Sequence, residues 1–434
     1  MKNILIIGAG KSATFLIEYL CRVCENHGWR LIIGDADLHL AESKINHCKN
    51  AEAVSIDAAN QAKRTDLIRE SDLVISMLPP HLHFFVAQDC LHFSKHLLTA
   101  SYIDEKIKNL ASEIEKKGLL FLCETGLDPG IDHMSAMKII DYIKEIGGKI
   151  NSFKSHCGGL ISPESDDNPW HYKITWNSAN IVMAGSSGSV YKDKGAIVEI
   201  PYRHVFEKCK MVSVPGLFPL AWYPNRDSLS YISTYGLEHT DTFIRTTLRY
   251  PAFCRVWNVL VNMGFTDQND YEEIKDCKTY NEWFLVKNNE MTSPLPIIEN
   301  ETEFEHLVDY LGMRSNSLIR TEINNSASLL QKIMEKKLSM KPHDKDMIVM
   351  LHEIGYEVNG RKKEIRSSLI VKGEDEKRTA MAKTVGLPLG IAAKLILLGK
   401  IKLTGLHIPV IPEIYKPVLA ELETHQIKFI EESN

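Results

Sequence analysis

The sequence predicts an α/β protein whose N-terminal part is a Rossmann-type, doubly wound parallel sheet. Three observations lead to this prediction. The first 126 residues alternate between strand-like and helix-like segments, which is the pattern of parallel strands joined by crossover helices. The strand-like segments are continuously apolar, so we expect helices to cover both faces of the sheet. The first of these segments also leads into a glycine-rich turn that opens a helix.

The elements of this part follow in chain order. Apolar runs predict strands at residues 3–7, 30–34, 53–56, 73–77, 96–100 and 119–123. Apolar residues at helical spacing predict helices between them, at residues 12–25, 38–48 and 60–69. Such a succession is expected to form one sheet.

The chain has a different character beyond residue 126. We expect helices at residues 131–146 and 380–398, mostly helical chain at 253–340, β-prone chain up to about 250, and strands at 347–352 and 365–371. The last two strands flank Asn359-Gly360, a strong signal for a two-residue hairpin. Because no repeat or low-complexity linker separates these parts, we expect interleaved domains.

The composition excludes several classes of protein. Of 434 residues, 44% are apolar and 25% are charged, so disordered, fibrous and disulfide-scaffold proteins are excluded. The formal charge of −5 gives no electrostatic reason to expect nucleic acid or an anionic membrane as a partner. No apolar run reaches the roughly 20 residues that span a bilayer, and the N-terminus lacks a signal-peptide layout. We expect a cytoplasmic protein of two or three domains.

The nine cysteines are scattered, apart from the pair Cys21 and Cys24. A CxxC pair can mark a redox centre or half of a zinc site. Here the pair lies in a predicted helix, and no second pair completes a tetrahedral metal site. We therefore expect both residues to be buried thiols in a reducing compartment, and no metal.

The strongest local motif is Gly8-Ala9-Gly10-Lys11-Ser12-Ala13, which follows the first strand. It has the form of the dinucleotide-binding fingerprint Gly-x-Gly-x-x-Gly/Ala. The first glycine permits a tight turn, the second lets the backbone approach a pyrophosphate, and the small alanine permits close helix packing. A glycine-rich turn without a ligand is the alternative.

Two further segments concern the same cofactor. Asp35 ends the second strand, where an acidic group accepts the adenosine ribose hydroxyls. Its charge would repel a 2′-phosphate, so we expect NAD in preference to NADP, although a simple turn residue is the alternative. Ser76 and Leu78 lie at the end of the fourth strand, where the loop of such folds passes under the nicotinamide ribose. A strand ended by prolines explains that segment almost as well.

Other polar segments are candidates for the reacting site. Asp128 lies between Glu124 and His133 after the sixth strand, where ligands bind in open α/β sheets. It could instead only cap the helix that Pro129 starts. Arg226 and Arg245 lie in later polar strings, and guanidinium groups suit bidentate capture of carboxylates.

Together these segments resemble the saccharopine dehydrogenase family, most closely its glutamate-forming branch. The matching strings occur in order along essentially the whole chain, and they are GAGKSA, SYID, GLDPGIDH, YPNRDS, IRTTLRY and AMAKTVGLPLGIAAKLIL. In that family, saccharopine is made or broken by nicotinamide-dependent hydride transfer at the bond between the glutamate nitrogen and the lysine-derived carbon. The resemblance implies a homodimer that acts on a small amino-acid substrate.

The resemblance also implies a domain plan. It places a Rossmann domain at residues 1–126, rejoined by about 390–434. An α/β substrate-binding and dimerisation domain takes residues 127–255 and 341–389, and a helical domain is inserted at 256–340.

Site residues follow from the matching strings. Those that resemble the family's saccharopine-binding residues are Ser101, Tyr102, Arg226, Arg245, Thr246 and Thr247. Asp128 lies in the stretch near the reacting carbon and the nicotinamide, and Trp176 and Asn177 resemble a stretch near the cofactor.

The mechanism that the resemblance implies gives these residues roles. We expect Arg226 and Arg245 to bind substrate carboxylates. Asp128 and Tyr102 would position the amine and the attacking water, with acid–base help from either.

The sequence departs from the family pattern at three positions. Asp35 replaces a basic residue of NADP-dependent members, Thr246 replaces a glycine, and Trp170 replaces a smaller apolar residue. These departures leave the cofactor and the exact substrate open. The alternative functions are a lysine 6-dehydrogenase, a carboxynorspermidine synthase or a non-catalytic NAD-binding sensor.

Overall fold

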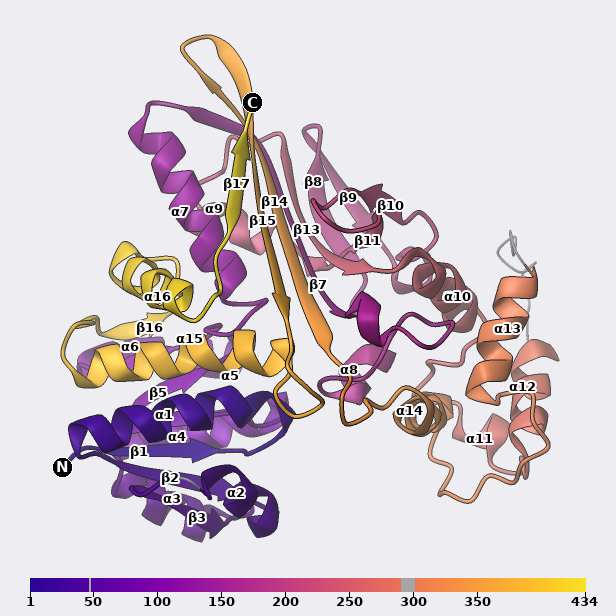
Figure 1. Ribbon diagram of the computed structural model, residues 1–434, viewed down its shortest axis with the longest axis horizontal. Helices are drawn as coiled ribbons and strands as arrows, with labels where there is room; N and C mark the ends of the chain where they lie inside the picture. The colour runs from indigo at the N-terminus through magenta and orange to yellow at the C-terminus, as the bar shows by residue number, and fades with distance from the viewer. Residues whose placement is uncertain (47, 290–300) are drawn as a thin grey trace. The chain divides into compact units, whose positions relative to one another are not determined.

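The computed structural model describes residues 1–46, 48–289 and 301–434 (Figure 1). Within it the chain forms two compact units, each built from separate stretches of sequence. The first contains residues 1–147 and 377–429, and the second contains residues 148–376 and 430–434. The interleaving is therefore real, although the limits differ from those expected from sequence.

The first unit contains a sheet with strand order β16-β6-β5-β4-β1-β2-β3 in the described chain. Neighbouring strands are parallel throughout. The strands are β1 (Asn3–Ile7), β2 (Arg30–Asp35), β3 (Ala51–Ser55), β4 (Leu73–Ser76), β5 (His96–Thr99), β6 (Leu120–Leu122) and β16 (Gly405–His407). The predicted Rossmann-type sheet is confirmed, and β16 is the strand that the sequence did not predict.

Helices of the first unit connect and cover this sheet. They are η1 (Lys11–Ala13), α1 (Thr14–His27), α2 (Leu38–Ile45), α3 (Gln61–Arg69), η2 (Pro80–Leu82), α4 (His83–His92), α5 (Glu105–Lys108), α6 (Ala111–Lys116), α7 (Ile131–Glu145), α15 (Ala380–Leu397) and α16 (Pro412–Thr424). Helix α7 and the first part of α15 lie in stretches that the expected domain plan assigns to the substrate-binding domain. They belong to the first unit because α7 packs on α16 and α15 packs on α1.

Helix α15 is long and apolar enough to cross a membrane, by length and composition alone. In the described chain, 78% of that apolar stretch is buried inside the protein. A β-carbon added to Gly386 would lie 2.8 Å from the backbone nitrogen of Leu16 on α1. The close approach of the two helices accounts for the apolar character of α15 (Figure 1).

The second unit is built on a mixed sheet whose main path is β10-β11-β13-β7-β14-β15-β17. Its strands are β7 (Lys149–Ile161), β8 (Ser189–Asp193), β9 (Ala196–Ile200), β10 (Lys210–Val212), β11 (Leu220–Pro224), β12 (Arg226–Asp227), β13 (Thr242–Arg249), β14 (Asp346–Val358), β15 (Arg361–Lys372) and β17 (Ile430–Ser433). Asn359 and Gly360 join β14 to β15 with positive φ angles of 52° and 70°, so the predicted hairpin is confirmed.

The remaining helices belong to this second unit. They are η3 (Pro163–Ser165), α8 (Ser178–Val182), η4 (Tyr202–His204), α9 (Ser230–Thr234), α10 (Pro251–Asn262), α11 (Tyr271–Ile274), α12 (Tyr280–Asn289), α13 (Glu301–Leu311) and α14 (Ser326–Lys337). Helices α10 to α14 confirm the expected helical stretch, whose residues 290–300 lie outside the described chain. They share one apolar core with Ala221 and Tyr223 of β11, which explains why they do not form a unit of their own.

Trp170 belongs to that core. Its side chain is fully buried, its ring contacts those of Phe253 and Trp257, and its Nε1 donates to the carbonyl of Leu307 at 2.9 Å. The departure from the family pattern at this position therefore serves the packing of the helices.

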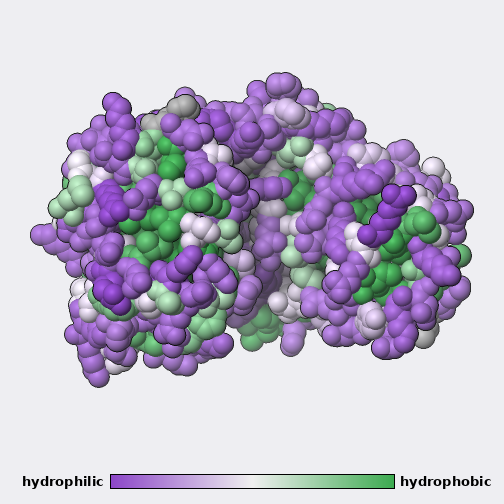
Figure 2. Space-filling view, turned by 90° about the horizontal axis from the view of Figure 1, so that it is seen from below, coloured by the Kyte–Doolittle hydropathy of each residue, from purple (hydrophilic) through white to green (hydrophobic). Residues whose placement is uncertain are grey.

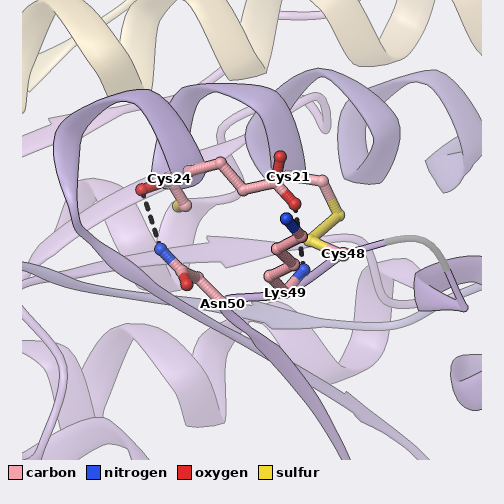
Figure 3. The surroundings of a disulfide bond; sticks show 6 residues. Cys21, Cys24, Cys48, Lys49 and Asn50 are labelled. Atoms are coloured by element: carbon pink, nitrogen blue, oxygen red, sulfur yellow. Dashed lines mark hydrogen bonds between the residues drawn. A yellow bond between two sulfur atoms is a disulfide. The ribbon is translucent and has the colours of Figure 1, made fainter.

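One cysteine expectation is wrong. Cys21 of α1 forms a disulfide with Cys48, with Cα atoms 5.4 Å apart and a sequence separation of 27 (Figure 3). The neighbouring Cys24 is a buried free thiol, and its carbonyl accepts a hydrogen bond from Asn50 at 3.2 Å. Cys48 lies too far along the sequence for the CxxC spacing to reveal the pairing.

The surface agrees with the composition. Hydrophilic residues predominate on the face seen in Figure 2, with apolar residues grouped in smaller areas between them. Exposed large apolar side chains of the second unit include Ile197, Met211 and Phe218.

Candidate active site

The two glycines of the fingerprint have different reasons to be glycine. Gly8 has a φ of +106°, and a β-carbon there would lie 2.6 Å from the carbonyl oxygen of Met77, so the fold itself requires glycine. Gly10 has an ordinary φ of −60°, and its β-carbon would meet no atom of the described residues within 4 Å. The missing side chain at Gly10 therefore leaves open space at the start of α1, as close approach of a pyrophosphate requires.

The rest of the fingerprint surrounds that space. Lys11 is exposed, Ser12 is half-buried and Ala13 is buried in η1. Lys44 of α2, which the sequence did not suggest, donates from Nζ to the Gly10 carbonyl at 2.6 Å. Burial lowers the pKa of Lys44 to about 8. A cation thus lies directly behind the glycine-rich loop.

Asp35 is tied into the same loop. Its Oδ2 accepts a hydrogen bond from the Ala9 backbone nitrogen at 2.6 Å, and its Oδ1 accepts one from the Asp37 nitrogen at 2.9 Å. The carboxylate therefore has a fixed orientation at the carboxyl end of β2. Asp37 in turn caps α2 through the Leu40 nitrogen.

At the carboxyl ends of β4 and β5, a histidine joins two of the predicted serines. Ser76 Oγ lies 2.8 Å from Nδ1 of His83, and Ser101 Oγ lies 2.7 Å from Nε2 of the same ring. His83 is 3% exposed, and burial lowers its pKa to about 4. Leu78, from the loop after β4, is half-buried and packs against the apolar core.

Tyr102 lies in a segment that a buried acid holds in place. The carboxylate of Glu124 accepts a hydrogen bond from the Ile103 nitrogen at 3.2 Å and lies 3.0 Å from Nε2 of His133. The Glu124 backbone nitrogen donates to the Ser101 carbonyl at 3.1 Å. The chain on either side of Tyr102, which is itself half-buried, is therefore anchored to the end of β6.

Asp128 belongs to a closed turn at the start of α7. The peptide bond between Asp128 and Pro129 is cis, and the Gly126 nitrogen donates to the Pro129 carbonyl at 3.0 Å. Gly130 is the residue that precedes the helix, and its nitrogen donates to the side chain of Asp132 at 2.6 Å. The N-cap position of α7 is therefore Gly130 and not Asp128. The half-buried carboxyl of Asp128 remains a candidate for chemistry.

In the second unit, the two arginine-bearing strings lie together. The Asn225 nitrogen, next to Arg226, donates to the Arg245 carbonyl at 2.9 Å. The Arg245 nitrogen donates to Ser228 Oγ at 3.0 Å. Arg226 is exposed and has a positive φ of 51°, whereas Arg245 is buried with its guanidinium 4.5 Å from the ring centre of Tyr231. The two arginines therefore lie on neighbouring stretches of the second unit.

Thr246 and Thr247 separate into different surroundings, because successive side chains of a strand point to opposite faces. Thr246 is buried, and its Oγ1 lies 2.7 Å from Nδ1 of His156. Nε2 of that histidine lies 3.2 Å from Glu353, and burial lowers the pKa of His156. Thr247, half-buried, shares the face of Arg245. Thr246 therefore lies on the opposite face of β13 from Arg245 and Thr247. The sequence predicts all three residues in one substrate site because they are adjacent in the chain.

Trp176 and Asn177 lie at the start of α8. Asn177 is exposed and caps this helix by accepting a hydrogen bond from the Ala179 nitrogen at 3.0 Å. Trp176 is half-buried and packs against the core that contains α10 to α14. These contacts account for both residues structurally and leave their cofactor role a prediction. Among the described residues, no group of three or more His, Cys, Asp and Glu side chains is placed to hold a metal ion.

Comparison with known proteins gives the family. The model of the saccharopine dehydrogenase NADP binding domain matches residues 4–122, and that of the saccharopine dehydrogenase C-terminal domain matches residues 126–427. The chain belongs to the saccharopine dehydrogenase family. The first unit accordingly carries the nicotinamide-dinucleotide-binding domain of that family.

Individual relatives agree with this membership. The chain is 31% identical to the saccharopine dehydrogenase (NADP(+), L-glutamate-forming) of Schizosaccharomyces pombe, over 100% of this chain and 99% of the relative. It is also 31% identical to an alpha-aminoadipic semialdehyde synthase of Arabidopsis thaliana, over 99% of this chain but 45% of the relative. The chain thus spans about half the length of the synthase and nearly all of the dehydrogenase.

A solved structure has the same fold. The apo saccharopine dehydrogenase (L-Glu forming) from Saccharomyces cerevisiae superposes with a TM-score of 0.88 at 29% identity, over 100% of both chains. The similarity therefore extends over both units of the saccharopine dehydrogenase family fold.

Proposed function

We propose that this chain is a nicotinamide-dependent saccharopine dehydrogenase of the L-glutamate-forming kind. The proposal rests on the hydrogen bonds between the loop that contains Arg226 and strand β13, which contains Arg245. Saccharopine carries three carboxylates, and a desolvated carboxylate needs a paired cation or several hydrogen bonds. Relatives with this printed name match over nearly their whole length.

The glycine-rich loop fits the cofactor that the family uses. Within the part of the chain that the structure describes, a β-carbon added to Gly10 would have no atom within 4 Å, and such open space at a helix start suits a pyrophosphate. Gly8, Gly10 and the backbone of η1 would hold the phosphates, with the charge of Lys44 behind them. The bound cofactor would supply a hydride acceptor for the lysine-derived carbon next to the saccharopine nitrogen.

Residues of this chain would bind and orient the substrate for the transfer of the hydride. Arg226 and Arg245 would bind substrate carboxylates and so fix the position of the secondary amine. Tyr102 and Asp128 would hold the amine and the attacking water, and either can take the proton that the amine must lose first. Water then adds to the carbon, and the C–N bond breaks to give glutamate and the semialdehyde.

We further propose a preference for NAD over NADP. Both carboxylate oxygens of Asp35 are oriented by backbone N–H groups, and a fixed negative charge at the end of β2 disfavours a 2′-phosphate while accepting ribose hydroxyls. The dehydrogenases of Schizosaccharomyces pombe and Saccharomyces cerevisiae are named for NADP(+), so this chain would differ from them in cofactor choice.

Saccharopine oxidation measured in parallel with NAD and NADP tests both proposals. We expect turnover with saccharopine but not with lysine or diamines, and a higher kcat/KM with NAD. Asp35→Asn keeps one of the two hydrogen-bond acceptors and removes the charge, so we expect kcat/KM with NADP to rise about tenfold. Asp37→Asn, on the same loop, is the control. Equal use of both cofactors by the wild type would refute the preference.

Arg226→Ala tests the substrate site. Loss of a charge-assisted hydrogen bond should raise the KM for saccharopine about tenfold to a hundredfold, and because Arg226 is exposed the fold should survive. Arg203→Ala, another exposed arginine of the second unit, should leave the KM unchanged. A wild-type KM in Arg226→Ala would remove this residue from the site.

The assembly and the compartment stay predictions. We propose a homodimer, supported by the family resemblance and by the exposed apolar side chains of the second unit, and sedimentation analysis tests it. We also propose a cytoplasmic protein, supported by the free thiols among the described cysteines. The disulfide of Cys21 counts against a strictly reducing environment, and localisation of a tagged chain tests the proposal.

A further inference from the structure

We infer that His83 is a positioning residue, which couples the hydroxyl groups of Ser76 and Ser101 and gives them opposite hydrogen-bonding roles toward bound ligands. The inference deepens the proposed function and rests on it for the identity of the substrate. Its basis is geometric, because the two serines lie at the carboxyl ends of neighbouring strands β4 and β5, where ligands bind in such sheets. One imidazole ring bonds to both of them, at 2.8 and 2.7 Å.

A neutral imidazole requires the two serines to take different hydrogen-bonding roles. Such a ring has one N–H donor and one lone-pair acceptor. One serine must therefore accept a hydrogen bond from the ring, which leaves its own proton for a ligand. The other serine must donate to the ring, which leaves its oxygen lone pairs for a ligand. A serine without this partner could rotate its hydroxyl into either role.

The surroundings of His83 keep the ring neutral. The side chain is 3% exposed, and burial is the main cause that lowers its pKa, with Asp104 acting in the opposite direction and His81 in the same direction. A protonated ring would donate to both serines and abolish the distinction. Burial of a polar ring that only filled space would cost free energy compared with an apolar residue.

The proposed ligands decide which serine has which role. A substrate carboxylate needs a donor, so Ser101 accepts from Nε2–H of His83 and offers its own proton to saccharopine. Ser76 then donates to Nδ1 and offers its oxygen to a donor on the dinucleotide, such as a ribose hydroxyl. His83 thereby links the serine that contacts the substrate to the serine that contacts the cofactor, and it does not itself contact the reacting atoms.

Two amide substitutions separate the two bonds. The amide of Asn occupies the position of Nδ1, so His83→Asn keeps the bond to Ser76 and loses the bond to Ser101. The amide of Gln reaches the position of Nε2, so His83→Gln does the reverse. We expect His83→Asn to raise the saccharopine KM about three- to tenfold with an unchanged KM for NAD, and His83→Gln to show the opposite pattern. His83→Phe should raise both constants.

Controls and binding measurements make this test decisive. His92→Asn, an exposed histidine of the same helix α4, should leave both constants unchanged. In the Ser101→Ala background, His83→Asn should not raise the saccharopine KM further, because the hydroxyl that the ring orients is already absent. Thermal unfolding checks that each variant is folded, and a general loss of stability cannot produce two opposite patterns.

Readouts without turnover separate this inference from the proposed function. We expect NADH, titrated by fluorescence, to bind about three- to tenfold more weakly to His83→Gln and as in the wild type to His83→Asn. In nitrogen NMR, the His83 ring should stay neutral from about pH 5.5 to 8.5 and shift in both Ser76→Ala and Ser101→Ala. A wild-type saccharopine KM in Ser101→Ala would refute the proposed contact between Ser101 and the substrate. It would not bear on the coupling of the two serines through His83. Equal NADH affinities of the two amide variants, or a ring signal that ignores either serine, would overturn the coupling.

Discussion

At the scale of single residues, the glycine-rich loop separates what the fold requires from what a ligand requires. Gly8 would place a β-carbon 2.6 Å from the Met77 carbonyl, whereas Gly10 would place one in open space. The motif likewise gives the two positions different roles, a tight turn for the first glycine and close approach of a pyrophosphate for the second. The structure explains the first glycine by packing, and the cofactor role of the second stays a prediction.

Substitution of each glycine by alanine should therefore give opposite results. We expect Gly8→Ala to lower the free energy of unfolding by about 1–3 kcal/mol, because its φ of +106° and its contact are both unfavourable for a side chain. Gly10→Ala should stay within about 0.5 kcal/mol of the wild type but bind NADH at least about tenfold more weakly. Urea unfolding and fluorescence titration measure the two effects. Wild-type affinity in Gly10→Ala would contradict the assignment.

At the scale of elements, the disulfide joins α1 to the chain that follows α2 (Figure 3). Both helices follow segments that we propose to bind the cofactor, since α1 follows the glycine-rich loop and α2 follows Asp35. The bond links residues with a sequence separation of 27. It restricts the unfolded chain and so stabilises this part of the first unit.

Removal of the bond gives a prediction for this pair of elements. Cys48→Ser should lower the free energy of unfolding by about 3 kcal/mol under non-reducing conditions. The difference from the wild type should disappear in the presence of dithiothreitol, because the wild type then also lacks the bond. Cys277→Ser, at a partly exposed free thiol, is the control. Equal stabilities without reductant would show that the bond does not form in solution.

At the scale of the whole molecule, the first unit needs both ends of the chain. Helix α15 covers α1 and strand β16 pairs with β6, although the whole stretch of residues 148–376 lies between the two parts of this unit. Strand β17 then pairs with β15 in the second unit. Neither unit is therefore a continuous stretch that can be cut out at one boundary.

Fragments test this requirement. Residues 1–147 alone should lack cooperative unfolding, because the face of α1 around Leu16 loses its cover. The same fragment joined by a glycine–serine linker to residues 377–429 should unfold cooperatively and bind NADH. Circular dichroism during heating and fluorescence titration measure the two properties. Cooperative unfolding of the short fragment would contradict the role given to α15.

The sequence by itself predicted those features that depend on neighbours in the chain. Apolar runs and helical spacing predicted six parallel strands of the first sheet, the helix that begins at residue 131 and the hairpin at Asn359 and Gly360. The sequence also predicted the turn and the helix start at the fingerprint from Gly8 to Ala13, because both are local features of the chain. Adjacency within one strand, however, did not reveal that Thr246 and Arg245 face opposite sides.

Only the tertiary structure decided the features that join distant residues. The bond of Cys21 to Cys48, the pairing of β16 with β6 and the placing of Lys44 behind Gly10 are examples. The link through His83 between two serines on different strands is another. Composition and periodicity report which face of an element is buried, but not which element covers it. That choice depends on packing and loop closure across the whole chain, and it positions the candidate active site.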